Sequence, residues 1–339
     1  MRACATSYTE KRGRRLLLVA GALCAASALL SVCIGSTDVP LSQLWQALIG
    51  SGQAEAVSNI LWYMRLPRTL ACLAAGAALA VSGGIIQMVL ANPLASPNII
   101  GVNAGAGLAV ALCCAFLPTM GLGLSGAAFA GAALAVALVV GIAGRTGASR
   151  TSVILSGVAV NACLNACSDA VVTLFPDSGL GSADFRVGGF SAILLDRLWP
   201  AAILIGAAVL ISFTLSNELE VLSLGEETAH GLGLPVKGMR TLLLGLAALL
   251  AGAAVSFAGQ LGFVGLIVPH MVRYLGGREG GYFLPASALL GATLVTLCDI
   301  AARRLFSPYE IPVGILLSLI GGPFFLLLLF RRRGGHRGD

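Results

Sequence analysis

Charged side chains are scarce in this chain of 339 residues. Asp, Glu, Lys and Arg together make up 11% of the sequence, less than half of the about 25% that average domains carry. The region from residue 69 to residue 144 contains none of the four. Hydrophobic residues make up 57%, and the mean hydropathy is +0.92. This composition excludes a soluble globular enzyme, a nucleic-acid-binding domain and a disordered tail, and it predicts an all-α integral membrane protein.

Motifs for nucleotide hydrolysis and metal catalysis are also missing. A P-loop needs a lysine in the pattern G-x-x-x-x-G-K-[ST], and neither Lys11 nor Lys237, the two lysines of the chain, lies in one. No H-E-x-x-H and no C-x-x-C occurs, and the nine cysteines are scattered. In apolar runs cysteine behaves as a small hydrophobic residue. We therefore expect no metal site and no catalytic residue in this chain.

Apolar runs long enough to cross a bilayer recur along the sequence. A spanning helix needs about 20 apolar residues, and candidates cover residues 16–35, 69–91, 99–117, 124–143, 152–174, 198–216, 284–301 and 311–330. The run 241–275 is too long for one crossing and too short for two of full length. The first run follows basic residues, as a signal peptide does, but it exceeds the about 7–15 apolar residues of a signal peptide. It predicts a retained helix.

The distribution of Lys and Arg predicts the topology. With two crossings in 241–275 there are ten helices, both termini share a side, and that side carries 15 of the 21 basic residues. With one crossing, the basic cluster at 331–333 would lie outside, against the positive-inside rule. We predict one transmembrane domain over residues 16–330, between a basic cytoplasmic N-terminus (1–15) and a basic cytoplasmic tail (331–339).

Glycine spacing and a lone acidic residue give two further predictions. Gly76, four residues before Ala80, predicts close helix packing in lipid. Residues 83–84 and 259–265 predict non-helical backbone, because several glycines in one turn weaken a helix. Asp169 is the plausible ionisable group for ion coupling, but its place near the end of a segment favours a solvated or paired helix end.

The polar insertion at about residues 217–237 predicts a short amphipathic helix. Ser223 is in the position of an N-cap, with Glu226 three residues later, as in a capping box. Glu227 also falls in the positive first turn, and Gly231 is placed to end the helix. The pattern is compatible with docking to a cytoplasmic partner and also with a plain surface helix.

Ordered motifs over almost the whole chain resemble one family. The motifs are Arg65-Leu66-Pro67-Arg68, then Gln87 and Asn92-Pro93-Leu94-Ala95, then Leu222 to Gly233, then Gly262-Phe263-Val264-Gly265-Leu266-Ile267-Val268-Pro269-His270-x-x-Arg273, then Asp299-Ile300-x-x-Arg303, and finally Gly321-Gly322-Pro323-Phe324-Phe325. In this order they resemble the FecCD-type permease subunits of ABC importers for iron–siderophore complexes, haem and cobalamin.

This resemblance implies the fold, the location and the partners. The fold would be that of a type II ABC importer permease with both termini cytoplasmic, working as a homodimer in the lipid of the cytoplasmic (inner) membrane of a prokaryote. Two cytoplasmic ATP-binding subunits would hold ATP and Mg²⁺, and an extracytoplasmic binding protein would deliver the substrate. No cofactor on this chain and no nucleic acid is implied.

The resemblance also implies roles for individual residues. Binding-protein docking would use Arg65, Arg68 and Arg303. The ATPase coupling loop would comprise Leu224, Gly225, Glu226, Glu227, Ala229, His230, Gly231, Leu232 and Gly233. The pathway gate would include Asn92, Pro93 and Leu94, and approximately Thr151 and Ser152. A structural motif would consist of Gly262, Phe263, Gly265, Pro269, His270 and Arg273, with His270 capping or hydrogen-bonding at a helix start rather than binding substrate.

We therefore expect the permease subunit of an ATP-driven importer that translocates an iron complex by alternating access, with a ferric siderophore as the first choice of substrate. Import of haem or cobalamin by the same architecture is an alternative. A secondary transporter driven by an ion gradient and a membrane-embedded enzyme are alternatives of a different class.

Overall fold

Every element in the described part of the computed structural model is helical. The structure describes residues 2–334 except positions 36, 38, 50–54, 118–122, 147–148, 192, 194, 277–280 and 308. Residues 335–339 of the predicted tail lie outside the described residues. The elements are α1 (Arg2–Cys33), α2 (Leu41–Ile49), α3 (Glu55–Asn59), η1 (Ile60–Arg65), α4 (Leu66–Val89), η2 (Pro97–Ile100), α5 (Val102–Phe116), α6 (Gly123–Arg145), α7 (Arg150–Leu174), α8 (Pro176–Val187), α9 (Leu195–Thr214), α10 (Ser216–Ser223), α11 (Glu226–Gly231), α12 (Val236–Ala258), α13 (Val264–Leu275), α14 (Phe283–Arg304) and α15 (Val313–Gly334).

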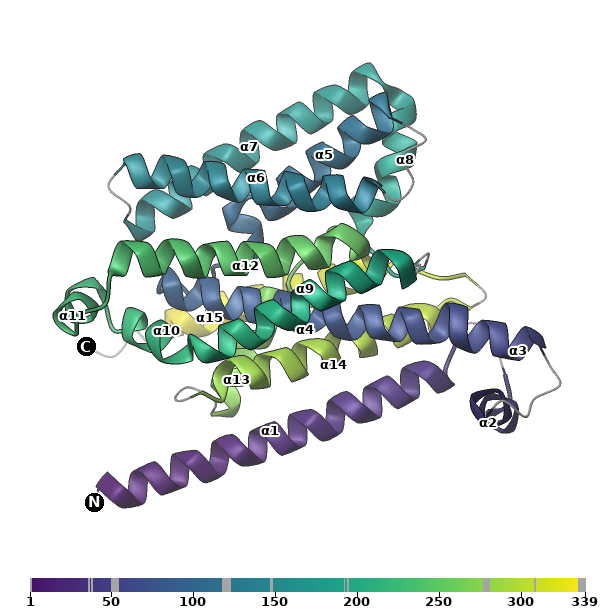
Figure 1. Cartoon of the computed structure of the whole chain (residues 1–339), viewed down its shortest axis with the longest axis horizontal. Coiled ribbons are helices and arrows are strands. Elements are labelled where there is room, and N and C mark those ends of the chain that lie inside the picture. The colour runs from purple at the N-terminus through teal and green to yellow at the C-terminus, as the bar shows by residue number, and fades with distance from the viewer. Residues whose placement is uncertain are drawn as a thin grey trace.

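The long helices lie side by side and form one bundle (Figure 1). α4 is central and packs against α12, α13 and α14. α5, α6, α7 and α8 form a group on one flank, and α1 lies on the opposite flank against α14. In an apolar 18-residue segment of the stretch that includes α4, 78% of the residues are buried, against 17% in the corresponding segment of α1. The core therefore follows the central helices, and α1 is peripheral.

Small residues allow the central helices to approach closely. A Cβ atom on Gly76 would collide with the backbone carbonyl of Gly291 in α14, and one on Gly83 with that of Gly265 in α13. Such backbone contact is a common mode of helix association in lipid, and it confirms the packing predicted for Gly76. The break predicted at residues 83–84 is wrong, because α4 continues through both glycines and uses Gly83 for packing.

The two ends of the bundle differ. We name the end that carries α10, α11, the start of α1 and the end of α15 the α11 end, and the end that carries α2, α3 and α8 the α2 end (Figure 1). The start of α1 and the end of α15 thus share one side, as the topology predicts. Which face of the membrane this side meets stays a prediction.

The predicted segments all coincide with helices. Within the described part of the chain, six helical stretches are long and apolar enough to cross a membrane, and they belong to α1, α4, α6, α7, α12 and α14. α9 and α10 form a pair bent by 58°, and shorter apolar helices are α5, α13 and the 313–328 part of α15. The division of 241–275 is confirmed, because α12 ends at Ala258 and α13 begins at Val264. Ten crossings stays a prediction, since three helices are short.

Three helical elements at the α2 end were not predicted from the sequence, namely α2, α3 with η1, and α8. The start of α8 carries signals that could have been used, because Pro176 takes its first position and Asp177 lies in its first turn. Both are favoured at a helix N-terminus. α2 and α3 have no comparable run of 20 apolar residues, so a search for membrane spans does not find them.

Candidate functional site

The coupling segment at the α11 end consists of two short helices joined by a sharp turn. α10 ends at Ser223, and α11 begins at Glu226 after Gly225, whose φ is +120°. Glycine adopts such a backbone without steric cost. The predicted capping box is wrong, because the Ser223 hydroxyl donates to a carbonyl one turn earlier in α10. The predicted placement of Glu226 and Glu227 in the first turn is confirmed.

α11 presents most of its side chains to the outside. Glu227 and His230 are exposed, and the flanking leucines Leu224 and Leu232 are 65% and 64% exposed. Ala229 is the buried residue of this helix. Large apolar side chains beside exposed charges are typical of a surface that meets another protein. This surface lies at the α11 end of the bundle (Figure 1).

Two arginines attach the coupling segment to the bundle. Arg240 of α12 contacts the Glu226 carboxylate at 2.5 Å, and Arg150 at the start of α7 donates to the Leu222 carbonyl at 3.1 Å. The first contact ties α11 to α12, and the second ties α10 to α7. A displacement of the coupling segment can therefore reach α7 on one flank and α12 next to the central α4. From the sequence, both arginines contribute only to the predicted orientation, and neither contact is predicted.

Asn92 organises the loop between α4 and η2. Its side-chain oxygen accepts the backbone N–H of Leu94 at 3.0 Å, and its own N–H donates to the Gln87 carbonyl at 3.0 Å. Ala91 has φ +45°, an uncommon conformation for a residue with a Cβ atom. The loop is therefore a defined turn tied to the last turn of α4.

A pocket of about 260 Å³ brings three predicted groups together. Ala91 and Pro93 of the loop, Ser223 at the end of α10 and Arg273 of α13 all line it. The Asn92 loop, the coupling segment and the α13 motif therefore meet at the α11 end, although they are far apart in the sequence.

Thr151 and Ser152 are not part of this pocket lining. They lie in the first turn of α7, where the Ser149 hydroxyl accepts the N–H of Ser152 at 3.0 Å. Within the described part of the chain, no hydrogen bond joins them to the Asn92 loop.

Gln87 compensates for the proline inside α13. Pro269 has no N–H, so the Gly265 carbonyl four residues earlier lacks its usual helical partner. The Gln87 amide donates to this carbonyl at 3.1 Å, and Arg273 donates to the Gln87 oxygen at 2.6 Å. The Arg273 guanidinium also lies 4.9 Å from the centroid of the Phe283 ring, a cation–π distance. The motif thus joins α4, α13 and α14.

His270 lies in the middle of α13 rather than at its start. α13 begins at Val264 after Phe263, which has φ +65°, so a capping role of His270 at a helix start is wrong. The imidazole ring packs edge-on against Phe324 of α15, with the centroids 5.9 Å apart. Both rings line a largely apolar pocket of about 360 Å³ between α13 and α15.

At the α2 end, Asp299 of α14 holds two arginines. Its carboxylate contacts Arg68 of α4 at 2.9 Å and Arg303, one turn later in α14, at 3.0 Å. Arg68 also contacts Glu310 at 2.7 Å. Asp299 is fully buried, and a buried charge is costly unless it is paired. The charges of Arg68, Asp299, Arg303 and Glu310 therefore compensate one another in one network.

Arg65 and Arg303 bind the C-terminal end of α1. Arg65 donates to the carbonyls of Val32 and Cys33 at 2.9 and 2.8 Å, and Arg303 donates to the Ile34 carbonyl at 2.9 Å. The last carbonyls of a helix lack intrahelical partners and form the negative end of its dipole. Two guanidinium groups therefore cap α1 and fasten it to α4 and α14.

The three arginines lie at the same end but differ in exposure. Arg65 and Arg303 are 4% and 3% exposed, whereas the side chains of Arg68 and its partner Glu310 are 12% and 26% exposed. In this conformation Arg65 and Arg303 offer almost no surface to a docking protein. This arrangement could not be predicted from the sequence, because the partners of the arginines are distant along the chain.

Asp169 forms an exposed ion pair. Its carboxylate lies 3.4 Å from Arg186 of α8, and the two side chains are 66% and 49% exposed. This is the paired helix end that the sequence favours over a proton-coupling site. The arrangement gives no support to coupling by an ion gradient.

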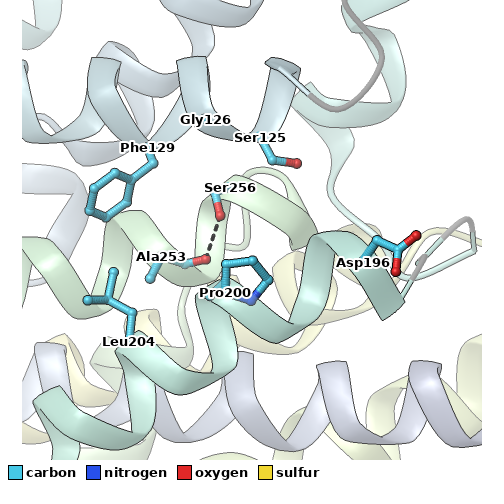
Figure 2. A pocket seen from close by; sticks show the side chains of 9 residues that line it. Ser125, Gly126, Phe129, Asp196, Pro200, Leu204, Ala253 and Ser256 are labelled. Atoms are coloured by element: carbon cyan, nitrogen blue, oxygen red, sulfur yellow. Dashed lines mark hydrogen bonds between the residues drawn. The ribbon is translucent and has the colours of Figure 1, made fainter.

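Another cavity, of about 360 Å³, lies between α6, α9 and α12 (Figure 2). Phe129 and Pro200 contribute apolar surface, and Asp196 lies at one edge of the view. The Ser256 hydroxyl donates a hydrogen bond to the Ala253 carbonyl at 2.8 Å. None of the predicted site residues lines this cavity, so we assign the functional roles elsewhere.

Comparison with known proteins decides the family. The sequence pattern of the FecCD transport family matches residues 23–331. The chain belongs to this family. The resemblance stated from the motifs is confirmed, and with the apolar helices it identifies a multi-pass membrane protein.

Relatives in the family are permeases. The iron(3+)-hydroxamate import system permease protein FhuB of Bacillus subtilis is 37% identical over 327 residues, which cover 95% of this chain and 85% of the relative. The hemin transport system permease protein HmuU of Yersinia pestis is 36% identical over 319 residues, 91% of this chain and 95% of the relative. The fold is similar to that of a metal-chelate type ABC transporter in an inward-facing conformation, with TM-score 0.84 and 29% identity over 94% of this chain and 99% of that one. The all-α permease fold is therefore confirmed.

Proposed function

We propose that this chain is the membrane-spanning permease subunit of an ABC importer for an iron complex, with a ferric siderophore as the first substrate to test. The match of both sequence and fold over almost the whole chain carries the proposal, because it covers residues 23–331 and gives a TM-score of 0.84. The chain would form no covalent bond and bind no cofactor. Two ATP-binding subunits would hold ATP and Mg²⁺.

The permease would work as a homodimer in the cytoplasmic membrane of a prokaryote, with the α11 end in the cytoplasm. The excess of Lys and Arg on the side of the termini supports this orientation. Alternating access would then move substrate from the α2 end to the α11 end between two copies of the chain.

Coupling to ATP hydrolysis would use α10 and α11. The exposed Glu227, His230 and leucine pair support docking of an ATPase, and the contacts of Arg150 and Arg240 provide a route from that surface into α7 and α12. The Asn92 loop would form the inner gate, because it meets the coupling segment in the same pocket. Thr151 and Ser152, in the first turn of α7, would contribute the second element of this gate.

Docking of an extracytoplasmic binding protein would take place at the α2 end. Among the three predicted arginines we assign docking to Arg68, whose guanidinium is partly exposed and pairs with the more exposed Glu310. Carboxylates of a partner could compete with Glu310 for this group. The contacts of Arg65 and Arg303 support a structural role as caps of α1 instead.

The candidate substrates are taken from the names of the relatives. They are named for iron(3+)-hydroxamate, hemin and vitamin B12 import, so haem and cobalamin are the alternative substrates. A panel of ferric siderophores, haem and cobalamin, each with its binding protein, would distinguish them by uptake.

The test of the proposal is coupled ATP hydrolysis. The purified chain, combined with its ATP-binding subunits in lipid, should hydrolyse ATP faster when the loaded binding protein is added. Hydrolysis that does not respond to any binding protein, together with uptake that follows a proton or sodium gradient, would favour a secondary transporter and overturn the proposal.

A further inference from the structure

The α2 end carries a short helix with an exposed apolar face. α2 (Leu41–Ile49) has nine residues and none of them is charged. Leu41, Trp45 and Ile49 are spaced by four residues, so they share one face, and they are 66%, 64% and 60% exposed. Three large apolar side chains in one row form a patch rather than scattered surface residues. Such a patch requires a neighbour other than water.

The opposite part of the apolar surface of α2 rests on the bundle. Leu44 and Ala47 are buried against Leu61 of η1, in a small cluster apart from the main core. An isolated helix of this length is marginal in water, and a cluster of this size gives it limited support. A second apolar neighbour on the exposed row would stabilise the helix.

The polar residues of α2 occupy the remaining side. Ser42, Gln43 and Gln46 are all exposed, and at about 100° per residue they fall within an arc of about 100°. α2 thus has one apolar side on the protein, one free apolar side and one uncharged polar side. This division is typical of a helix that lies in the plane of a membrane interface.

The orientation of α2 fits that position. α2 is seen end-on in Figure 1, whereas the long helices of the bundle run across the picture. It therefore lies across the direction of the spanning helices, beside their ends. Val32, in the last turn of α1, packs against the small cluster below α2, so α2 is level with the end of the first predicted span.

Aromatic residues mark the same level. The three tryptophans of the chain are Trp45, Trp62 and Trp199, and they are 64%, 48% and 54% exposed. Trp62 belongs to η1 beside α2, and Trp199 lies in the second turn of α9, which begins at the α2 end (Figure 1). Tyr63 is 70% exposed. Trp and Tyr gather where a membrane meets water.

α1, whose last turn contacts the small cluster under α2, also exposes apolar side chains. Leu29 and Leu30, in the last turns of α1, are 69% and 46% exposed, and α1 is the least buried of the six long spans. Lipid is the occupant that covers the outer surface of a spanning helix. An uncharged row next to it offers nothing for charge-based recognition by a protein partner.

We propose that α2 lies in the membrane interface at the α2 end, with Leu41, Trp45 and Ile49 among the phospholipid acyl chains and Ser42, Gln43 and Gln46 facing water. The occupant of the exposed row is the bilayer itself. This inference rests on the chain being a membrane protein, and it requires neither the substrate nor the coupling proposed above.

Tryptophan quenching tests this position. In the full chain with Trp62→Phe and Trp199→Phe, Trp45 is the single remaining tryptophan. The variant is reconstituted in phosphatidylcholine vesicles that contain phospholipids brominated at a shallow or a deep acyl position. We expect a clear loss of Trp45 fluorescence with brominated lipid, larger for the shallow bromines than for the deep ones, and little quenching by iodide in the water.

A matched control moves the tryptophan across the helix. Adding Trp45→Phe and Gln43→Trp to the same background places the single tryptophan on the polar side, where iodide should quench it and brominated lipid should not. Thermal unfolding and gel filtration of both variants check that they are folded. Quenching of Trp45 by iodide alone would place the row in water, and shielding from both quenchers would place it against another protein. Either result overturns the proposal, while ATP-driven uptake tests the proposed function separately.

Discussion

The charged side chains of the two predicted contact regions differ in burial. At the α2 end, Arg65, Arg303 and Asp299 are 4%, 3% and 0% exposed, and partners within the chain bind each of them. At the α11 end, Glu227 and His230 are exposed. A buried and paired charge holds helices together, whereas an exposed charge is available to another protein. Motif membership alone does not distinguish these roles, but burial and the identity of the partners do.

Removal of Asp299 should give the largest effect. Asp299→Asn would leave Arg68 and Arg303 without their shared carboxylate, and breaking a buried ion pair costs about 3–5 kcal/mol. Thermal unfolding of the purified chain in detergent should show a large loss of stability. Asp169→Asn is the matched control, because that pair is exposed and should cost at most about 1 kcal/mol. Equal losses of thermal stability in the two variants would contradict the difference between buried and exposed charges.

Removal of Arg65 should have the next largest effect. Arg65→Ala frees the last carbonyls of α1, and hydrogen bonds to a charged group are worth about 1.5–3 kcal/mol. Arg65→Lys keeps the charge but loses the planar fork, so an intermediate loss is expected. Thermal unfolding and proteolysis after α1 measure the effect. An Arg65→Ala chain of normal stability that no longer binds its binding protein would instead assign Arg65 to docking.

Much of the fold could be predicted because membrane helices appear in the sequence as long apolar runs without charge. The absence of charge between residues 69 and 144 locates three helices, and the glycine-rich residues 259–265 locate the break between α12 and α13. α2 and α8 are missed because neither is a run of about 20 apolar residues. Both are short elements at the α2 end, where hydropathy gives a weak signal.

The contacts of the site could not be predicted in the same way. Arg68 and Asp299 are 231 positions apart, and Arg273 and Gln87 are 186 apart, so no local pattern links them. The family motifs identify the positions, but a resemblance assigns Arg65, Arg68 and Arg303 one common role. The structure distinguishes them because the C-terminal carbonyls of α1 bind two of the three.

Replacement of Gln87 should give a smaller loss at the joint of α4 and α13. Gln87→Leu leaves the Gly265 carbonyl unpaired, at a cost of about 1–2 kcal/mol. Pro269→Ala restores an N–H four residues after Gly265, so it should recover part of the stability when combined with Gln87→Leu. Thermal unfolding of the single and double variants measures this coupling. Additive losses, with no rescue, would contradict the hydrogen-bond account.

The exposed charges of α11 should have the smallest effect on stability. Glu227→Ala with His230→Ala should change the free energy of unfolding by no more than about 0.5 kcal/mol, yet reduce the ATP hydrolysis that the loaded binding protein stimulates. Glu226→Ala is a poorer probe, because Glu226 binds the buried Arg240 and its loss should also lower stability. Unchanged stimulation in the double variant would remove α11 from the coupling surface.

Uptake by the reconstituted importer tests directly whether the chain belongs to an ATP-driven importer of an iron complex. Vesicles that hold the chain and its ATP-binding subunits, with ATP supplied to the α11 end and loaded binding protein to the α2 end, should accumulate a ferric siderophore. We expect uptake that requires ATP, persists with an uncoupler and falls in the Glu227→Ala/His230→Ala variant. Uptake that continues without ATP and stops with the uncoupler would contradict it.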